Sequence, residues 1–380
     1  MSKQLSQIEF ENARADVLCF DNGTEVKEYH AMIHVSGQRL TYAKQLEAIM
    51  NAYQGLLDRL PDTQAVFKRY FLSDAANQAD EIVVADMTDC AKSIIEQAPL
   101  DGTKVALWVY LMSGVQTGMT KSGLYEACHG QFRHLWNASA HNLAANSEYQ
   151  MRLLFNEYVM QLAEEGCKLA DNCIRTWLFV NDIDLNYGGV VRARNQVFFT
   201  QGLTVHTHFI ASTGIGGRQQ DPNVLSQMDN YAIAGIQPEQ IHYLYAPTHL
   251  NRTSDYGVSF ERGTYIDYAD RRHVFISGTA SINNKGEIMF PKDIEKQTQR
   301  MWENVEALLK EADCTYDDVM EMIVYMRDVA DYQTVKELFE ERFPDNPYVI
   351  TLAPFCRPGG LVEIECMAIK QQDKPEFPAF

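Results

Sequence analysis

The stretch Val319-Met320-Glu321-Met322-Ile323-Val324-Tyr325-Met326-Arg327-Asp328 sets the pattern of this sequence. Its short, mostly apolar run predicts a buried strand, and Asp follows where the run ends. The residues before it predict an amphipathic helix, with one apolar face made of Ile294, Met301, Trp302, Val305, Leu308 and Leu309. A second amphipathic helix is predicted at 332–343. Helix, strand and helix is therefore the order to search for in the rest of the chain.

The same order occurs twice more. The helix, strand and helix are predicted at 149–163, 173–182 and 190–199 in the middle of the chain, and at 42–57, 65–74 and after Ala75 near its start. All three strands end in Asp, at Asp74, Asp182 and Asp328. Alternating segments such as 125–138 and 263–282 are typical of hairpin strands and precede the helices. Each unit is thus predicted to be a hairpin, a helix, a strand, a helix and a further strand.

A sheet with helices on one face keeps a bare apolar face, and three such units side by side can bury these faces in a common core. We therefore expect an α+β fold of three tandem units that form a single-chain pseudo-trimer. The units span 1–120, which is degenerate, 121–238 and 239–372, followed by a tail at 373–380 whose prolines stop helices and central strands. The alternative is two unrelated domains, with a chance recurrence in the first third.

Composition excludes several classes of protein. The 33 basic and 51 acidic residues give a net charge of −18, and no run of Lys or Arg is present, which argues against nucleic-acid binding. No stretch of about 18 uncharged apolar residues occurs, and the start has no apolar segment, so we expect a cytoplasmic protein with no membrane partner.

Metal and cofactor sites are not signalled either. The eight cysteines are scattered without a C-x-x-C pair. His206 and His208 are expected on one face of a strand, and His30 and His34 could share one face of a helix, but no acidic or cysteine partners stand at ligand spacing. Neither a Walker A pattern nor a G-x-S-x-G elbow is present. We expect no metal and no cofactor.

At the third unit the residues resemble a known superfamily. The resemblance to the RidA/YjgF superfamily rests on Ile276–Ser281, Gln297–Thr298, Glu303–Val305, the strand that ends at Asp328, and Leu361–Glu365. It is strong over 263–368, moderate in the middle unit and weak in the first. The superfamily forms homotrimers of such units, so the resemblance implies the same assembly from one chain. In its enamine/imine deaminase branch an arginine upstream of the last strand holds the substrate carboxylate, whereas the stretch here, Pro347–Thr351, has no arginine.

Three segments are similar to the chorismatases, multi-unit relatives that hydrolyse the enolpyruvyl ether of chorismate. They are Ala211–Arg218, Tyr256–Arg262 and Cys356–Glu365, and the second is shorter than the family pattern. The spacing from Cys356 to Glu363 resembles the branch that yields 3-hydroxybenzoate. The resemblance implies that Glu363 is the acid and that Cys356 assists formation of the aromatic product.

The residues themselves support acid chemistry. Cleaving a vinyl ether requires protonation of its methylene carbon, hence a carboxylic acid that is still protonated near neutral pH. Glu363 and Glu365 lie two apart on a strand and share one face, so charge repulsion and burial would raise one of the two pKa values. The alternative is a solvated strand face.

Anion binding is expected from arginines next to predicted strand ends, namely Arg218, Arg262 and Arg357. Thr213 and Gly214 belong to a Gly-rich segment that could hold a carboxylate or be only a turn, and Tyr256 comes from the second chorismatase-like segment. Arg357 would lower the pKa of its neighbour Cys356, unless Cys356 is simply a buried thiol.

We expect a chorismatase-like lyase or hydrolase whose site lies where the middle and third units meet. Its partner would be a small anionic metabolite such as chorismate, and its products pyruvate and a hydroxybenzoate or a dihydroxycyclohexadiene carboxylate. Two alternatives remain: a RidA-like enamine/imine deaminase, and a non-catalytic module that binds a small carboxylate.

Overall fold

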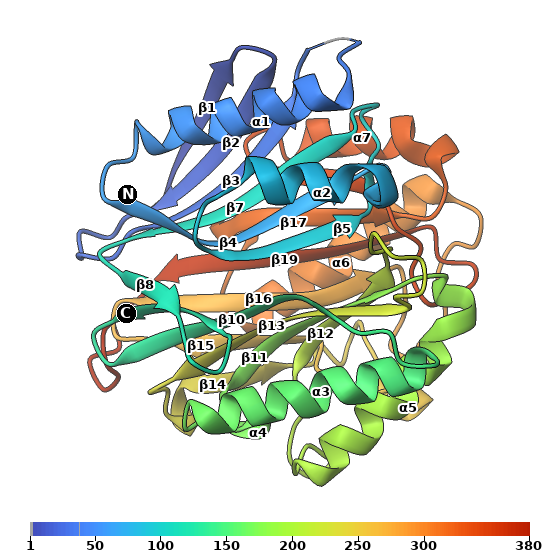
Figure 1. Ribbon diagram of the computed structural model, residues 1–380. Coiled ribbons are helices and arrows are strands. Elements are labelled where there is room, and N and C mark those ends of the chain that lie inside the picture. The colour runs from blue at the N-terminus through green and yellow to red at the C-terminus, as the bar shows by residue number, and fades with distance from the viewer. Residues whose placement is uncertain (1–2, 38) are drawn as a thin grey trace.

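Three sheets face the centre of the molecule in the computed structural model, which describes residues 3–37 and 39–380. The helices lie on the outside, with α1 and α2 at the top of Figure 1, α3, α4 and α5 at the bottom, and α6 and α7 at the back right. Each sheet and its helices form one unit, called here the first, middle and third unit in chain order.

The elements of the three units are as follows. The first unit contains β1 (Lys3–Phe10), β2 (Ala13–Phe20), β3 (Glu28–Val35), α1 (Tyr42–Leu57), β4 (Thr63–Leu72), α2 (Ala75–Ala85), β5 (Ala91–Glu96) and β7 (Val105–Ser113). The middle unit contains β8 (Gln116–Met119), β9 (Tyr125–His129), β10 (Phe132–His141), α3 (Ser147–Glu164), α4 (Leu169–Asn172), β11 (Cys173–Val180), α5 (Ile183–Thr200), β12 (Ala211–Gly216) and β13 (Ser226–Ala234). The third unit contains β14 (Ile241–Leu244), β15 (Gly263–Asp267), β16 (Arg271–Ala280), α6 (Ile294–Glu311), β17 (Val319–Met326), α7 (Tyr332–Arg342), β18 (Tyr348–Leu352) and β19 (Val362–Gln371).

The three sheets have one topology. Their strand orders are β1-β2-β3-β7-β4-β5, β8-β9-β10-β13-β11-β12 and β14-β15-β16-β19-β17-β18. In each sheet the two strands that flank α2, α5 or α7 are parallel, and the other pairs are antiparallel. The predicted repeat is confirmed, and so is the α+β class. The prediction of a helix only from 190 in the middle unit is wrong at its start, because α5 already begins at Ile183.

Asp74, Asp182 and Asp328 occupy equivalent places. Each stands two residues after the end of its strand, β4, β11 or β17, and precedes a helical segment as its N-cap residue. The predicted equivalence of these three strands is confirmed. Of the three, Asp328 caps its helical segment with its side chain, which accepts from the Ala330 N–H at 2.9 Å, whereas the side chains of Asp74 and Asp182 make no such bond.

The units contact one another in a ring. Strand β5 of the first unit packs on β10 of the middle unit, β12 of the middle unit packs on β16 of the third, and β17 of the third packs on β3 of the first. The short β6 (Ala98–Pro99) leaves the first unit and pairs with β18, extending the third sheet. Because β8 pairs with β9, the middle sheet begins at Gln116, a few residues before the boundary proposed at residue 120.

The outer faces of the sheets form apolar cores with their helices, such as Trp302 and Leu308 of α6 against Val324 and Ile364. The inner faces are more polar than the sequence predicts. Arg69 of the first unit donates to Asp229 of the middle unit at 3.1 Å. Arg175 of the middle unit pairs with Glu365 of the third at 2.9 Å, and Arg271 of the third pairs with Glu28 of the first at 2.7 Å, so each contact between units contains a buried ion pair.

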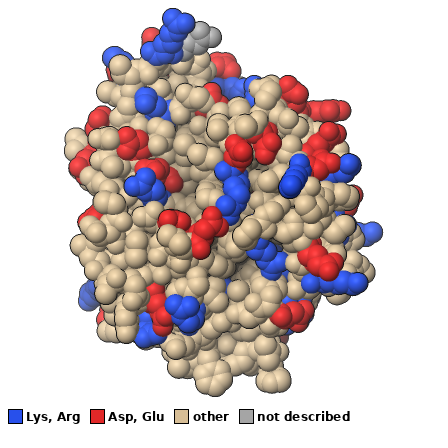
Figure 2. Space-filling view, turned by 90° about the vertical axis from the view of Figure 1, so that its right-hand side faces the viewer, with Lys and Arg blue, Asp and Glu red and all other residues tan. Residues whose placement is uncertain are grey.

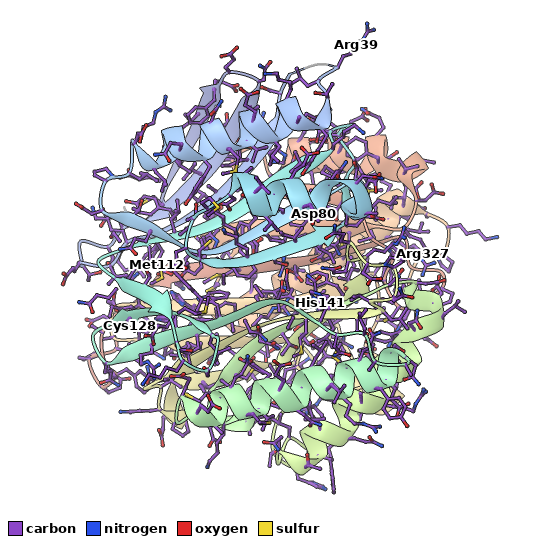
Figure 3. The ribbon with its side chains drawn as sticks, viewed as in Figure 1. Arg39, Asp80, Met112, Cys128, His141 and Arg327 are labelled. Atoms are coloured by element: carbon purple, nitrogen blue, oxygen red, sulfur yellow. The ribbon has the colours of Figure 1, made fainter. Side chains whose placement is uncertain are left out.

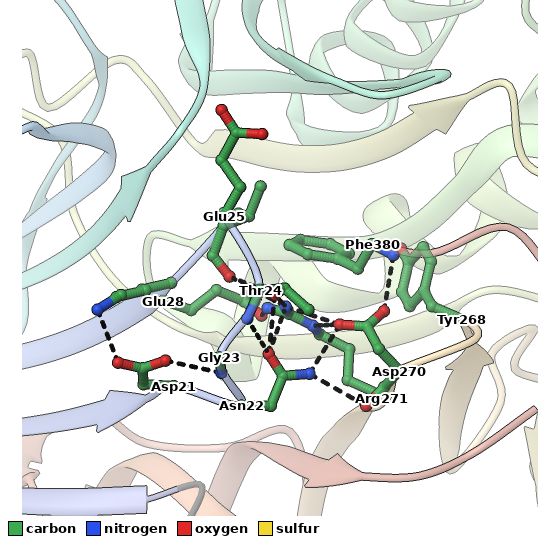
Figure 4. Close-up of polar contacts among 12 residues, drawn as sticks. Asp21, Asn22, Gly23, Thr24, Glu25, Glu28, Tyr268, Asp270, Arg271 and Phe380 are labelled. Atoms are coloured by element: carbon green, nitrogen blue, oxygen red, sulfur yellow. Dashed lines mark hydrogen bonds and ion pairs between the residues drawn. The ribbon is translucent and has the colours of Figure 1, made fainter.

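The tail at 373–380 contains no helix or strand, as its prolines predict, but it is packed against the protein. Phe380 is buried, and its backbone N–H donates to Asp270 Oδ1 at 2.7 Å. Asn22 Nδ2 donates to the other oxygen of Asp270, and the neighbouring Arg271 donates to Thr24 Oγ1 at 2.7 Å (Figure 4). The tail therefore docks where the first and third units meet.

Two expectations about histidine are wrong. His206 and His208 lie in a loop rather than on a strand, and His30 and His34 lie on β3 rather than on a helix.

Within residues 3–37 and 39–380, no group of three or more His, Cys, Asp or Glu side chains is placed to hold a metal ion. In the same part of the chain no helix combines the length and apolar character needed to span a membrane. Acidic and basic side chains are interspersed on the face shown in Figure 2.

Candidate active site between the middle and third units

A cavity of about 190 Å³ lies where the middle and third units meet, and we call it the interface pocket. Six of the nine predicted site residues line it: Gly214, Tyr256, Arg262, Cys356, Arg357 and Glu363. The remaining walls come from Tyr187, Arg194, Ser212, Val258, Phe260, Gly278, Ala280, Ile282 and Phe355. The three chorismatase-like segments, which are far apart in sequence, therefore all contribute to one pocket.

Glu363 is the only carboxylate among the residues that line this pocket. It lies on β19, is 7% exposed, and packs against the backbone of Gly278, where an added Cβ would stand 2.1 Å from Oε1. Burial, and then the negative charge of Glu365, raise its pKa to about 8, although Arg262 and Arg357 act in the opposite direction. The carboxyl group is therefore largely protonated at neutral pH, in agreement with the expectation for two acids on one strand face.

Glu365 shares that face of β19 but does not line the interface pocket. Its carboxylate accepts from Arg175 Nη2 at 2.9 Å and from Trp177 Nε1 at 2.7 Å, and it is 2% exposed. The alternative of a solvated strand face is wrong for both acids. Its oxygens are engaged in this network and its charge raises the pKa of Glu363, so a catalytic role for Glu365 itself stays a prediction.

Arg262 and Arg357 reach the pocket from the third unit. The buried Arg262 donates through Nε and Nη2 to the backbone oxygen of Asn251, at 3.2 and 3.1 Å, and burial lowers its pKa. Arg357 donates to the Gly286 carbonyl at 2.7 Å and stacks on Tyr256, with its guanidinium carbon 3.9 Å from the ring centre. Tyr256 thus orients a guanidinium group at the pocket wall.

Arg194 and Tyr187 come from α5 of the middle unit and were missed by the sequence analysis. Arg194 is 1% exposed, and its Nε and Nη2 have no hydrogen-bond partner among the described residues. A buried guanidinium with free donors in a pocket is a strong attractant for an anion. One feature of the sequence could have identified Arg194: it is an arginine on the apolar face of a helix, next to Ala193 and Val197, both of which are buried.

Cys356 is half-buried beside Tyr187, with which it forms a hydrogen bond. Burial, and then the charge of Glu363, raise the pKa of the thiol to about 11, and the nearby Arg357 does not offset them. Arg357 does lower this pKa, as predicted, but desolvation and the charge of Glu363 outweigh it, so the expected activated thiol is not found. Cys356 is a neutral thiol at neutral pH.

The Gly-rich segment forms β12 and not an open turn. Gly214 faces the pocket, where an added Cβ would stand 2.8 Å from Tyr187 Cε2, so its missing side chain makes room for Tyr187. Thr213 points away from the pocket and accepts hydrogen bonds from Arg175 Nη2 at 2.6 Å and from the Gly278 N–H at 2.9 Å. Thr213 thus links the buried network to the pocket wall, and its predicted role in substrate binding stays a prediction.

Arg218 does not reach the interface pocket. It lies where the first and middle units meet, is half exposed, and donates to Glu96 Oε1 at 3.3 Å. The chain leaves the pocket after Gly216, whose N–H donates to the Pro354 carbonyl, so the structure gives no support to the predicted substrate-binding role of Arg218.

The loop that carries Cys356 and Arg357 is tied to α5 by Arg327 (labelled in Figure 3). Both terminal nitrogens of Arg327 donate to the carboxylate of Asp184, each at 2.9 Å, and Nη2 also donates to the Phe355 carbonyl at 2.8 Å. A bidentate pair of this kind fixes orientation as well as distance. The two walls of the pocket are thereby joined at one edge.

Comparison with known proteins agrees with this architecture. The family model "Endoribonuclease L-PSP" matches residues 261–370. RutC family proteins of Pyrococcus abyssi and Drosophila melanogaster are 30% and 32% identical over 100 and 103 residues, which is 26% of this chain and 79% and 72% of theirs. A crystal structure of chorismatase aligns with 80% of this chain and 93% of its own at 17% identity, with a TM-score of 0.62. This chain therefore belongs to the RidA/YjgF superfamily, to which the RutC and L-PSP proteins belong, and its three units share the overall fold of chorismatase.

Proposed function

We propose that this protein is a chorismatase-type enzyme that cleaves the enolpyruvyl ether of chorismate or a close analogue. The observation that carries the proposal is a buried carboxyl group, Glu363, with a pKa of about 8, in a pocket lined by three guanidinium groups. An acid that keeps its proton at neutral pH is what protonation of a vinyl ether carbon requires.

The proposed reaction begins at Glu363. Its O–H donates the proton to the methylene carbon of the enolpyruvyl group, and the π electrons of that double bond form the new C–H bond. The ether oxygen shares the positive charge left on the adjacent carbon. Water then adds to that carbon and loses a proton to Glu363, which restores the acid. In the resulting hemiketal the hydroxyl group becomes the carbonyl of pyruvate as the bond to the ring oxygen breaks, and its proton passes to that ring oxygen, which leaves as a hydroxyl group.

Three arginines would balance the charge of the substrate. A dianion is repelled by a protein of net charge −18, so recognition has to be local. Arg194, with two free donors, faces the pocket from the middle unit, and Arg262 and Arg357 face it from the third. This placement suits one carboxylate on each side of the ring, with Glu363 beside the ether.

Cys356 is assigned a role after protonation. It is neutral, so it does not act as a thiolate, and its contact with Tyr187 holds it at the pocket wall. In the proposal it favours loss of the elements of water from the ring, which yields hydroxybenzoate in place of the dihydroxycyclohexadiene carboxylate. The alternative of an enamine/imine deaminase is disfavoured by the absence of arginine in Pro347–Thr351.

The test is to incubate the purified protein with chorismate and to follow pyruvate with a coupled lactate dehydrogenase assay. Continuous pyruvate release that Glu363→Gln abolishes supports the proposal. The matched control is Glu303→Gln, an exposed acid on α6. Chorismate binding without turnover indicates the non-catalytic carboxylate-binding alternative. Turnover of an enamine substrate but not of chorismate indicates the deaminase.

A further inference from the structure

A second concave region lies where the first and third units meet, and we call it the first–third groove. Its volume is about 480 Å³. One wall is formed by β2 and β3 of the first unit, and the other by α7 and β18 of the third. The groove occupies the place in the ring that corresponds to the interface pocket. The strand pairing shows this equivalence. Ile350 of the groove pairs with Val324 on β17, just as Gly214 of the interface pocket pairs with Leu178 on β11.

Asp16 on β2 is the distinctive group of this groove. It is 6% exposed, and its Oδ2 accepts from Arg14 Nη2 at 2.9 Å. Its second oxygen, Oδ1, is buried and has no hydrogen-bond partner among residues 3–37 and 39–380. Burying a carboxylate oxygen without a hydrogen-bond donor is unfavourable in free energy, so a ligand that donates a hydrogen bond to this oxygen would bind favourably.

The charges around Asp16 favour a cationic donor. Glu9, Asp101 and Glu340 also line the groove. The basic side chains there already face acids, because Arg14 pairs with Asp16, Lys336 lies 3.5 Å from Glu340, and His34 Nδ1 lies 3.8 Å from Asp101. The interface pocket has the opposite character, with three arginines and one protonated acid. A carboxylate ligand suited to that pocket would be repelled here.

Two aromatic rings, Tyr332 and Tyr348, also line the groove. Aromatic faces attract ammonium groups, and an ammonium group also carries the N–H donors that Asp16 Oδ1 lacks. His34 shapes the groove floor through its Nε2, which lies 3.1 Å from the carbonyl oxygen of Tyr348 and so joins the two walls.

We propose that the first–third groove binds a small molecule that carries a primary ammonium group, with Asp16 Oδ1 as the acceptor and Tyr332 and Tyr348 as the aromatic walls. This site is separate from the interface pocket and does not depend on the function proposed for it. Such a ligand bridges two units of the ring and would therefore stabilise their contact.

The test is isothermal titration calorimetry of the full chain with 1,4-diaminobutane at low ionic strength. We expect saturable binding that weakens at least tenfold in Asp16→Asn, which keeps the shape and removes the charge. Glu363→Gln, in the other pocket, should bind as the unchanged protein does. Tetramethylammonium, which has no N–H donor, should bind at least tenfold more weakly than the diamine.

Three results would overturn the proposal. They are no binding of the diamine, equal binding of tetramethylammonium, and undiminished binding by a folded Asp16→Asn protein. The last two would mean general attraction of cations to an acidic protein. Should Asp16→Asn fail to fold, a crystal soaked in diaminobutane decides the matter: density for the diamine within hydrogen-bond distance of Asp16 supports the site, and density elsewhere or none refutes it.

Discussion

The middle unit meets the third unit and the first unit through equivalent strands, yet only one of these interfaces contains the candidate active site. Gly214, Gly278 and Glu363 line the interface with the third unit. The strand registers place Ile94, Ser139 and Gln227 at the same positions of the interface with the first unit. There the Ile94 N–H donates to Ser139 Oγ at 2.9 Å, and Gln227 Nε2 lies 3.3 Å from the Ile94 carbonyl oxygen.

The difference shows how a repeated frame becomes one site. Where the middle unit meets the first unit, a large side chain and neutral groups that hydrogen-bond to one another fill the space. Where it meets the third unit, two glycines leave room, and a carboxyl group is buried without a counter-ion of its own. The strand frame is the same at both interfaces, so side-chain volume and one buried carboxyl group distinguish the interface that contains a pocket from the one that is filled.

The largest effect is expected from Glu363→Gln, which keeps the shape and removes the acid. Pyruvate release should fall by about 10² to 10⁴, the usual contribution of a general acid. Adding Gln227→Glu to this variant should restore nothing, because Gln227 does not line the interface pocket, where Arg194, Arg262 and Arg357 stand. Full activity of Glu363→Gln would mean that another group is the acid or that the proposed reaction is wrong.

Arg357→Lys should cost roughly 1.5 to 3 kcal/mol, or about 10- to 100-fold, mainly in kcat/KM. Lysine keeps the charge but loses the planar fork and the stacking on Tyr256. The matched control is Arg218→Lys at the other interface, which should stay within about twofold of the unchanged enzyme. Equal losses in both variants would mean that Arg357 acts only through the total charge.

Gly214→Ala tests the role of side-chain volume. The new Cβ would stand 2.8 Å from Tyr187 Cε2, so Tyr187 has to move into the pocket. We expect KM for chorismate to rise by roughly 3- to 10-fold, in proportion to a packing cost of about 1 kcal/mol. Gly118→Ala, where an added Cβ meets nothing within 4 Å, is the control and should leave steady-state kinetics unchanged.

The raised pKa of Glu363 predicts a pH dependence of stability. Between its ordinary value of 4.5 and about 8, the folded protein holds a proton that the unfolded chain has lost, so stability falls as pH rises through this window. Glu363→Gln should therefore be more stable than the unchanged protein at pH 9, by roughly 2 to 4 kcal/mol, and nearly equal to it at pH 4. Thermal melts at the two pH values measure this difference, and parallel curves would contradict the assigned pKa.

The smallest effect on rate is expected from Cys356→Ala. Pyruvate release should stay within about threefold, because the thiol does not deliver the first proton, while chromatography should show less hydroxybenzoate and more of the diene. Cys128→Ala, on β9 of the middle unit, should leave the ratio unchanged. An unchanged ratio in Cys356→Ala would leave this residue as a packed thiol.

Local periodicity in the sequence determined the units of the fold. The helix at 42–57 has the predicted bounds, the strands ending at the three Asp residues are equivalent, and Glu363 and Glu365 share one strand face. These features depend on the spacing of neighbouring residues, which a single sequence displays. The acid and two of the pocket arginines were also accessible, because they lie in recognisable motifs of the third unit.

The tertiary structure alone decided which side chains meet. Arg194 and Tyr187 join the pocket because α5 of the middle unit packs across the interface, and Arg218 leaves it because its side chain pairs with Glu96 of the first unit. The engagement of Glu365 by Arg175 and the raised pKa of Cys356 likewise arise from burial and from charges brought close by folding. Such effects depend on distance in space, and distance between units is not encoded in local periodicity.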